Sequence, residues 1–332
     1  MSERSDKRSN RSFGVRVKVG VLMGGPSAEH EVSLASAQTV LDHLDPDIYQ
    51  PVSIKISKRG QYFLNGKLTI EIKALKSCDI IFNALHGTFG EDGTIQAICA
   101  RHNVRYTGSG VAASALAMNK FHSRELFKLA EINVPKTLRV TCNENYAARL
   151  NFFITKITKL PVVVKPCSNG SSVGVAIVHS RINLRRAINA ALKLDPEVLV
   201  EEYIKGREVT CAVLQDGHGV KALPVTEIIP LSKHPFFNYE AKYKQSQAQE
   251  ITPAPIEDNL YKRVQACAVK THQILGCRGY SRTDMIVKNG GTIYVLETNT
   301  LPGLTENSLL PKAAEYAGIS IRQLLDTIIK NS

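Results

Sequence analysis

An Asn-Gly-Gly sequence at residues 289–291 lies between two apolar runs, and this pattern predicts a β-hairpin. With a two-residue turn at Gly290-Gly291, Ile286 would face Val295. Nearer the open end, Asp284 would face Glu297, and Arg282 would face Asn299. Because side chains alternate between the faces of a strand, these last four residues would share one face. The hairpin therefore fixes an antiparallel strand pair with opposed acidic side chains.

Two carboxylates directly opposite each other have Cβ atoms about 5 Å apart and repel. A divalent cation removes this repulsion, and oxygen ligands without Cys or His favour Mg²⁺. We therefore predict that Asp284, Glu297 and Asn299 bind metal, and that two ions about 3.5–4 Å apart share Glu297. The alternative is a surface hairpin with an ordinary Arg–Asp pair, and a one-residue change of register would remove the constellation.

The first third of the chain alternates strands with helices, which is typical of a parallel α/β domain. The expected strands are 17–23, 52–56 and 79–85, and the expected helices are 29–44 and 94–102. Glycine-rich loops follow the first and third strands. In such sheets ligands bind at the carboxyl ends of the strands.

Later segments predict one helix over 112–130 and a second helix beginning after the N-cap Ser180. Residues 232–255 show no clean periodicity, and a connection of this length predicts a lid or binding loop. The remaining expected elements are strands at 161–166, 175–178, 198–204, 208–214, 280–287 and 292–298, a helix at 256–275, and two short closing helices.

Composition narrows the class of protein. The chain has 332 residues with 43% apolar content and a formal net charge of +12. Such a surplus attracts anions, either nucleic acid or a phosphorylated small molecule, and the dispersed basic residues disfavour nucleic acid. We expect residues 1–14 to be a disordered basic tail, not a secretory signal, and we expect no membrane partner. Seven cysteines without a CxxC motif are typical of a reduced, cytoplasmic protein.

Lys165 ends an apolar strand and precedes Gly170-Ser171-Ser172, which suggests a phosphate-binding loop. This is not a Walker A loop, because the Lys precedes the glycine, and a plain strand–turn–strand is the alternative. Lys120 begins a helix and is either a second phosphate contact or a surface lysine. Glu201, Glu202 and Ile204 end a strand, where they bind ribose and adenine or simply terminate it.

Four further candidate residues come from three loops. Glu29 follows a glycine-rich turn in which it would suit an ammonium group better than a pyrophosphate. His86 is either a general base or a loop residue bonded to backbone. Lys242 and Tyr243 offer an ammonium group and a phenol in the 232–255 segment, and the alternative is a solvated loop.

Taken together, the chain resembles the D-alanine–D-alanine ligases of the ATP-grasp superfamily over residues 15–330. Single motifs are weak, but their order along the chain is specific. The matching stretches are 24–33, 85–87 with 90–94, 106–110, 164–166, 170–174, 239–243, 279–284 and 296–305. The resemblance implies an α/β fold with an N-terminal domain (15–110), a central ATP-grasp domain (111–204) and a C-terminal antiparallel-sheet ATP-grasp domain (205–330) that clamps ATP.

The resemblance also implies the reaction. ATP phosphorylates the carboxylate of one D-alanine, and the amine of a second attacks the acyl phosphate, giving D-alanyl-D-alanine for peptidoglycan precursors. It implies ATP and two Mg²⁺ or Mn²⁺ ions as cofactors, and a homodimer. The alternatives are a D-alanine–D-lactate or D-alanine–D-serine ligase, another carboxylate–amine ligase, and a basic nucleic-acid-binding protein. His30, Cys167, Phe237 and Leu301 depart from the residues common in the family.

Residue roles carried over from the family fall into three groups. Nucleotide contacts are Lys120, Lys165, Ser171, Glu201, Glu202, Ile204, Glu208 and Lys242. The metal ligands are Asp284, Glu297 and Asn299. The catalytic and substrate-binding set is Glu29, His86, Ser171, Tyr243, Arg282, Gly303, Ser308 and Leu309, in which Arg282 and the Gly303 amide would stabilise an oxyanion, Glu29 would pair with the first D-alanine, and Ser308 and Leu309 would receive the second.

Overall fold

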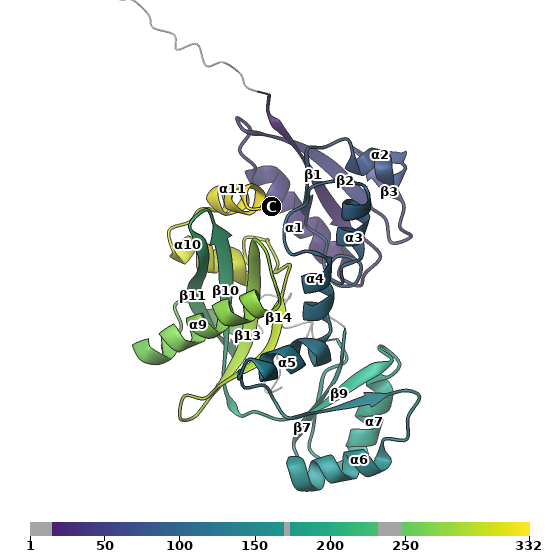
Figure 1. Ribbon diagram of the computed structural model, residues 1–332, viewed down its shortest axis with the longest axis vertical. Coiled ribbons are helices and arrows are strands. Elements are labelled where there is room, and N and C mark those ends of the chain that lie inside the picture. The colour runs from purple at the N-terminus through teal and green to yellow at the C-terminus, as the bar shows by residue number, and fades with distance from the viewer. Residues whose placement is uncertain (1–14, 169–172, 232–247) are drawn as a thin grey trace, which may run out of the picture.

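The computed structural model describes residues 15–168, 173–231 and 248–332. Its strands form three sheets, which we number in chain order, and the third lies between the first and the second (Figure 1). Among the described residues, no helix combines the length and apolar content needed to cross a membrane. All seven cysteines are free thiols.

The first sheet has the strand order β4-β3-β2-β1-β5. Strands β2, β1 and β5 are parallel, as predicted, and β3 and β4 extend the sheet as antiparallel strands. Apolar residues face both sides because α1 covers one face while α2 and α3 cover the other. The elements are β1 (Val17–Gly24), α1 (His30–His43), β2 (Tyr49–Ile56), β3 (Tyr62–Leu64), β4 (Lys67–Thr69), α2 (Glu71–Leu75), β5 (Ile80–Asn83) and α3 (Thr94–Arg101).

The second sheet is entirely antiparallel, with the order β6-β9-β7-β8. Its helices cover one face and enclose a separate apolar core. The predicted N-cap is confirmed, because Ser180 accepts a hydrogen bond from the Asn183 amide. The elements are β6 (Thr137–Thr141), α6 (Ala147–Phe152), the π-helical turn η1 (Phe153–Ile157), β7 (Val162–Pro166), β8 (Ala176–Val178), α7 (Arg181–Ala191) and β9 (Glu197–Glu202).

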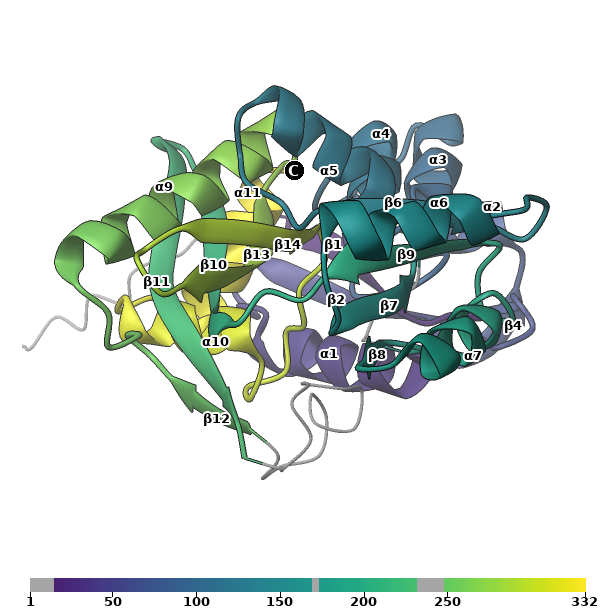
Figure 2. The ribbon, with the colours of Figure 1, turned by 90° about the horizontal axis from the view of Figure 1, so that it is seen from below.

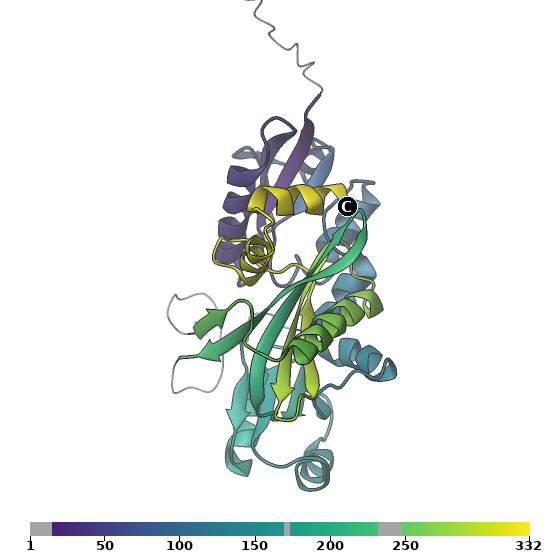
Figure 3. The same cartoon turned by 90° about the vertical axis from the view of Figure 1, so that its left-hand side faces the viewer.

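The third sheet is also antiparallel, with the order β12-β11-β10-β13-β14. Helix α9 packs along one face of this sheet. Helices α10 and α11 share an apolar core with the first sheet and with the end of the third sheet that lies nearest to it (Figures 1 and 3). Part of the segment expected to be a loop, residues 248–251, is strand β12 paired with β11. The elements are β10 (Gly206–Asp216), β11 (Gly219–Pro230), β12 (Ala248–Ile251), α9 (Asp258–Ile274), β13 (Tyr280–Lys288), β14 (Ile293–Asn299), α10 (Leu309–Tyr316) and α11 (Ile321–Lys330).

Two helices replace the single helix expected at 112–130. Helix α4 (Val111–Met118) ends at Asn119, whose ψ of 99° is extended, and α5 (Lys120–Leu129) begins directly after it. The Asn119 side chain accepts hydrogen bonds from the Phe121 and His122 amides, at 3.1 and 3.0 Å. A continuous helix was therefore wrong, because Asn119 acts as an N-cap inside an apolar periodic run, whereas the prediction that Lys120 begins a helix is confirmed.

Candidate nucleotide and substrate site

The acidic strand pair has the predicted alignment. Asp284 is paired with Glu297 and Arg282 with Asn299, so these side chains lie on one face of the third sheet. The turn is different from the prediction, because the Lys288 amide bonds to the Thr292 carbonyl and leaves three residues, 289–291, in the loop. The expected pairing of Ile286 with Val295 is wrong for the same reason.

A β-bulge restores the alignment. Ile286 pairs with Tyr294, one residue away from the expected partner, and the register shifts back between Met285 and Asp284. Leu296 is the extra residue at this shift, because its neighbours Val295 and Glu297 are the ones that pair with β13. The longer turn and the bulge are two one-residue changes of opposite sign, and they cancel at the acidic pair.

Cations and polar groups hold both carboxylates in place. Asp284 accepts two hydrogen bonds of 2.9 Å from the Arg282 guanidinium, one of 2.6 Å from the Thr210 hydroxyl and one of 3.2 Å from the Asn299 amide. Glu297 Oε2 lies 3.2 Å from Lys120 Nζ. The Arg282 and Asp284 side chains are 12% and 10% exposed, so this is not the solvated surface pair of the alternative interpretation.

The donor set fits a magnesium ion. Within the described ranges, no group of three or more His, Cys, Asp or Glu residues is arranged to hold a metal, so a wholly carboxylate, histidine or thiolate cage is absent there. Asp284, Glu297 and Asn299 supply two carboxylates and one amide oxygen from adjacent strands. Magnesium is commonly bound by one or two carboxylates, with water and phosphate oxygens completing its shell.

Lys165, Glu201 and Arg124 form a buried charge cluster on the second sheet. The antiparallel pairing of β7 with β9 brings Lys165 Nζ to 3.2 Å from Glu201 Oε2, and Arg124 pairs with the other carboxylate oxygen. Burial, with Arg124 nearby, lowers the pKa of Lys165 to about 8. Burial alone would raise the pKa of Glu201, but Arg124 and Lys165 together lower it, so Glu201 stays ionised.

Glu29 lies in a second cluster, at the carboxyl ends of β1 and β5. Its side chain is buried, and its amide donates to the Ser27 hydroxyl, which donates in turn to the His86 carbonyl at 2.6 Å. Gly87 has a φ of +70°, and a Cβ at this position would lie 2.5 Å from Glu29 Oε2. The carboxylate therefore depends on a glycine for its space.

His86 connects this cluster to the third sheet's C-terminal loop. Its Nε2 lies 2.8 Å from the Ser36 hydroxyl, and the Leu304 amide donates to the same hydroxyl at 3.5 Å. Gly303 precedes Leu304, and a Cβ at Gly303 would lie 2.8 Å from Ser308 Oγ. The His86 ring also lies 3.6 Å from Glu91, so it is held from both sides.

The other predicted residues lie on or beside β9, β10 and α10. Glu202 ends β9, buried Ile204 follows it, and Glu208 lies on β10 opposite Ile286. Ser308 precedes α10, with its hydroxyl 2.7 Å from that of Thr305, and Leu309 is the first residue of that helix. Ser171, Lys242 and Tyr243 lie outside the described residues.

Four residues that hold the candidate site residues in place were not predicted from the sequence: Ser36, Asn119, Arg124 and Thr210. Asn119 carries a readable signal, since an Asn before a new helical turn is a common N-cap. The other three lie within regular elements and meet their partners only through tertiary packing, so local patterns hold no sign of them.

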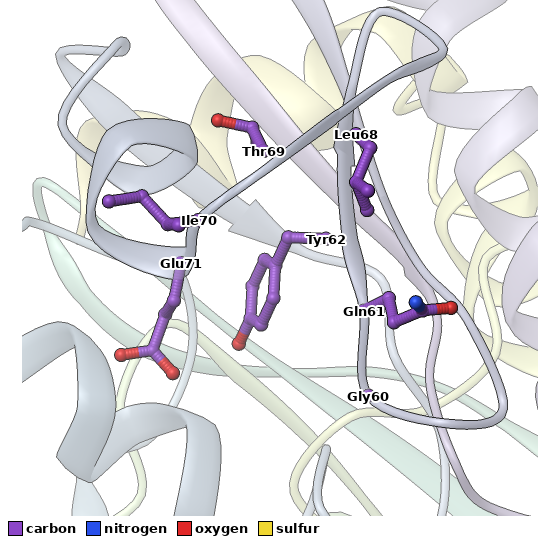
Figure 4. Close-up of a pocket in the computed structure, with 7 residues that line it drawn as sticks. All are labelled: Gly60, Gln61, Tyr62, Leu68, Thr69, Ile70 and Glu71. Atoms are coloured by element: carbon purple, nitrogen blue, oxygen red, sulfur yellow. The ribbon is translucent and has the colours of Figure 1, made fainter.

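A hollow of about 580 Å³ lies elsewhere, at the outer edge of the first sheet (Figure 4). Tyr62 and Glu71 point into it beside the exposed Leu68 and Ile70. None of the predicted site residues lines it, so this hollow is separate from the clusters above.

Lys120 of α5 lies beside the acidic strand pair of the third sheet, and Lys165 lies in the charge cluster of the second sheet. Three sheets with these residues between the second and the third fit the ATP-grasp class of ligases that the resemblance implies. Comparisons with known proteins narrow this class. The family model described as D-ala D-ala ligase C-terminus matches residues 126–330, and the N-terminus model matches residues 18–74 and 65–109. The chain belongs to the D-alanine–D-alanine ligase family.

Relatives and solved structures agree with this assignment. The chain is 41% identical to a D-alanine–D-alanine ligase of Geotalea uraniireducens, over 94% of each chain. It is similar to the VanG D-Ala:D-Ser ligase of Enterococcus faecalis, with a TM-score of 0.84 and 33% identity over 95% of this chain and 99% of that one. It is also similar to the Bacillus anthracis D-alanine–D-alanine ligase complexed with ATP, with a TM-score of 0.77 and 32% identity over 95% and 97%.

Proposed function

We propose that the protein joins two D-alanine molecules to D-alanyl-D-alanine through a D-alanyl phosphate, with ATP as the phosphoryl donor, for peptidoglycan precursors. The observation that carries the proposal is the pairing of Asp284 with Glu297 beside Lys120 in a chain of this family. Phosphoryl transfer requires positioning and charge neutralisation, and this arrangement offers both.

The chain's own residues divide the work. Lys120 and Lys165 would bind phosphate oxygens, while Glu201, Glu202, Ile204 and Glu208 would contact adenosine. Asp284, Glu297 and Asn299 would hold Mg²⁺ or Mn²⁺, two ions in all, which supply charge neutralisation at the phosphates when bound. Lys242 is proposed to contact the γ-phosphate.

At the substrate end, Glu29 would pair with the ammonium group of the first D-alanine, whose carboxylate oxygen attacks the γ-phosphorus as ADP leaves. The amine of the second D-alanine then attacks the acyl carbon. Arg282 and the Gly303 amide would donate to the developing oxyanion, an interaction typically worth about 3–4 kcal/mol per donor. Phosphate leaves as the peptide bond forms.

Three further roles and two properties are part of the proposal. His86 would orient the first substrate, and Ser308 and Leu309 would receive the carboxylate of the second. Ser171 and Tyr243 would exclude water from the acyl phosphate. A homodimer and a cytoplasmic location are proposed from the family resemblance and the seven thiols, respectively.

A D-alanine–D-serine ligase is the second candidate, because one structurally similar protein is the VanG D-Ala:D-Ser ligase. The deciding experiment measures phosphate release with Mg-ATP and D-alanine alone, or with added D-serine or D-lactate, and identifies the products by mass spectrometry. We expect D-alanyl-D-alanine to dominate each mixture. Phosphate release only with D-serine or D-lactate would replace the proposal, and no amino-acid-dependent release would end it.

A further inference from the structure

Arg124 is a buried arginine on α5, the helix that lies beside β14 (Figures 1 and 2). It is 1% exposed. It follows Lys120 by four residues, so the two side chains leave the same face of the helix. A cation this deeply buried is tolerated only when its donors have partners.

The guanidinium of Arg124 reaches two sheets. Its Nε and Nη2 donate to the Leu296 carbonyl, at 3.0 and 2.7 Å. Its Nη1 pairs with the Glu201 carboxylate and lies 3.4 Å from the Thr137 hydroxyl. Every nitrogen of the planar fork is therefore used, and the fork joins β14 of the third sheet to β6 and β9 of the second.

The contact on β14 falls at its irregular residue. Leu296 is the bulge residue, and such a residue is left out of the regular ladder. Arg124 donates to its carbonyl, while Lys120 contacts the side chain of the next residue, Glu297. Two cations from successive turns of α5 thus hold two successive residues of β14.

The contact on β9 falls on the carboxylate assigned to adenosine. Glu201 is shared between Arg124 and Lys165, so its orientation depends on both cations. A lysine at position 124 would keep the charge but could not fork, because a single ammonium nitrogen replaces three guanidinium nitrogens.

We propose that Arg124 is a positioning residue that sets the adenosine end of the nucleotide site relative to its metal end. It acts through Glu201 on one side and through the bulge before Glu297 on the other. This inference rests on the proposed function only in taking an adenine nucleotide and Mg²⁺ as the ligands.

The test compares the affinity for ADP in excess Mg²⁺ with the affinity in EDTA, by calorimetry without any amino acid. We expect Mg²⁺ to tighten ADP binding in the wild type, and we expect Arg124→Lys to reduce this tightening factor about fivefold. An equal loss of ADP affinity with Mg²⁺ and in EDTA, or no loss of affinity in either, would overturn the inference. A merely structural role for Arg124 would lower the affinity equally in both conditions.

Arg278→Lys is the matched control. Arg278 also forks onto backbone oxygens, those of Gly108 and Tyr106, both at 2.9 Å. We expect this variant to lose stability but to keep the wild-type Mg²⁺ factor. An equal loss of the factor in Arg278→Lys would overturn the assignment to Arg124.

Thr137→Val covers the case in which Arg124→Lys does not fold. It removes a hydroxyl that contacts the guanidinium, and we expect about a twofold fall in the Mg²⁺ factor. A wild-type factor in Thr137→Val would then overturn the inference. The binding measurements contain no amino acid. If D-alanine-dependent phosphate release failed, the proposed function would be wrong, but the effect of Arg124→Lys on ADP binding could still be interpreted.

Discussion

At Gly87 the chain adopts a φ of +70° beside the Glu29 carboxylate, and a Cβ there would lie 2.5 Å from Oε2. Gly87→Ala therefore adds two costs: the left-handed strain of about 1–2 kcal/mol and a displaced carboxylate. We expect the KM for D-alanine to rise about tenfold or more while the KM for ATP changes little. Steady-state kinetics with each substrate varied in turn checks this.

Gly60→Ala is the control for this prediction. Gly60 has a φ of +77°, and nothing lies within 4 Å of the point that a Cβ would occupy there. The substitution carries the strain without the collision. An equal rise in KM for D-alanine in both variants would contradict the position assigned to Glu29.

The pKa of Lys165, about 8, predicts how stability changes with pH. Between about pH 8 and the ordinary value of 10.5, the unfolded chain binds more protons at this group than the folded chain. The free energy of unfolding of the wild type, relative to Lys165→Met, should therefore rise across this window and be flat below it. Urea unfolding of both proteins at pH 7, 8, 9 and 10 measures the difference, and a difference that falls with pH would contradict the prediction.

At the scale of elements, the break between α4 and α5 places Lys120 in the first turn of a helix. Asn119→Ala removes the cap and should cost about 1 kcal/mol of stability by urea unfolding. Because the cap orients Lys120, the variant should also bind ADP more weakly. Asn119→Asp, which can still accept both amide hydrogen bonds, should retain most of the stability.

Ser180→Ala is the matched control for Asn119→Ala, because Ser180 caps α7, which packs on the face of the second sheet opposite to Lys165 and Glu201. It should lose similar stability and keep the wild-type affinity for ADP. Weaker ADP binding in both variants would mean that the loss reflects general destabilisation and not the position of Lys120.

The hairpin illustrates what a sequence can predict. The pairing of Asp284 with Glu297 is right only because the bulge offsets the longer turn. The existence of the hairpin and the face that these two residues share followed from alternation, the apolar runs and the Asn-Gly-Gly turn. The turn length did not, because two glycines with φ of +92° and +79° suit a three-residue loop as readily as a shorter one. The bulge at Leu296 was also invisible, since its carbonyl is held by Arg124, which is 172 residues away in the sequence.

The same division holds for the rest of the chain. Long apolar periodic segments such as α9 were predicted within two residues of their observed ends. The short strands β3, β4 and β12 were missed because they are three or four residues long and depend on neighbours for pairing. Candidate site residues within a motif could be named from the sequence, whereas the contacts of Ser36, Arg124 and Thr210 required the tertiary structure.

At the scale of the whole molecule, one apolar core joins the first sheet to the third through α10 and α11, while the second sheet has its own core. Glu297 is partly exposed and belongs to none of the apolar cores, so its substitution should leave folding intact. We expect Glu297→Ala to abolish ATP turnover while its urea midpoint stays near that of the wild type. Full turnover in this variant would remove the metal assignment.

Ligand-linked stability checks the same substitution without catalysis. ADP at one hundred times its dissociation constant should add about 2.7 kcal/mol to the wild-type free energy of unfolding. In Glu297→Ala, the gain with Mg²⁺ should shrink to the gain in EDTA. The thermal unfolding midpoint with and without metal measures both.

The bulge at Leu296 separates the tip of the hairpin from its acidic end. Residues gained or lost at the tip change the strand alignment between the turn and Leu296. Arg124 and Lys120 hold Leu296 and Glu297, which lie toward the open end of the hairpin. A hairpin redesigned with a shorter tip and no residue 296 would still oppose 284 to 297, but Arg124 would have no carbonyl to hold. Natural length variation should therefore gather at the tip and spare the stretch from 296 to 299.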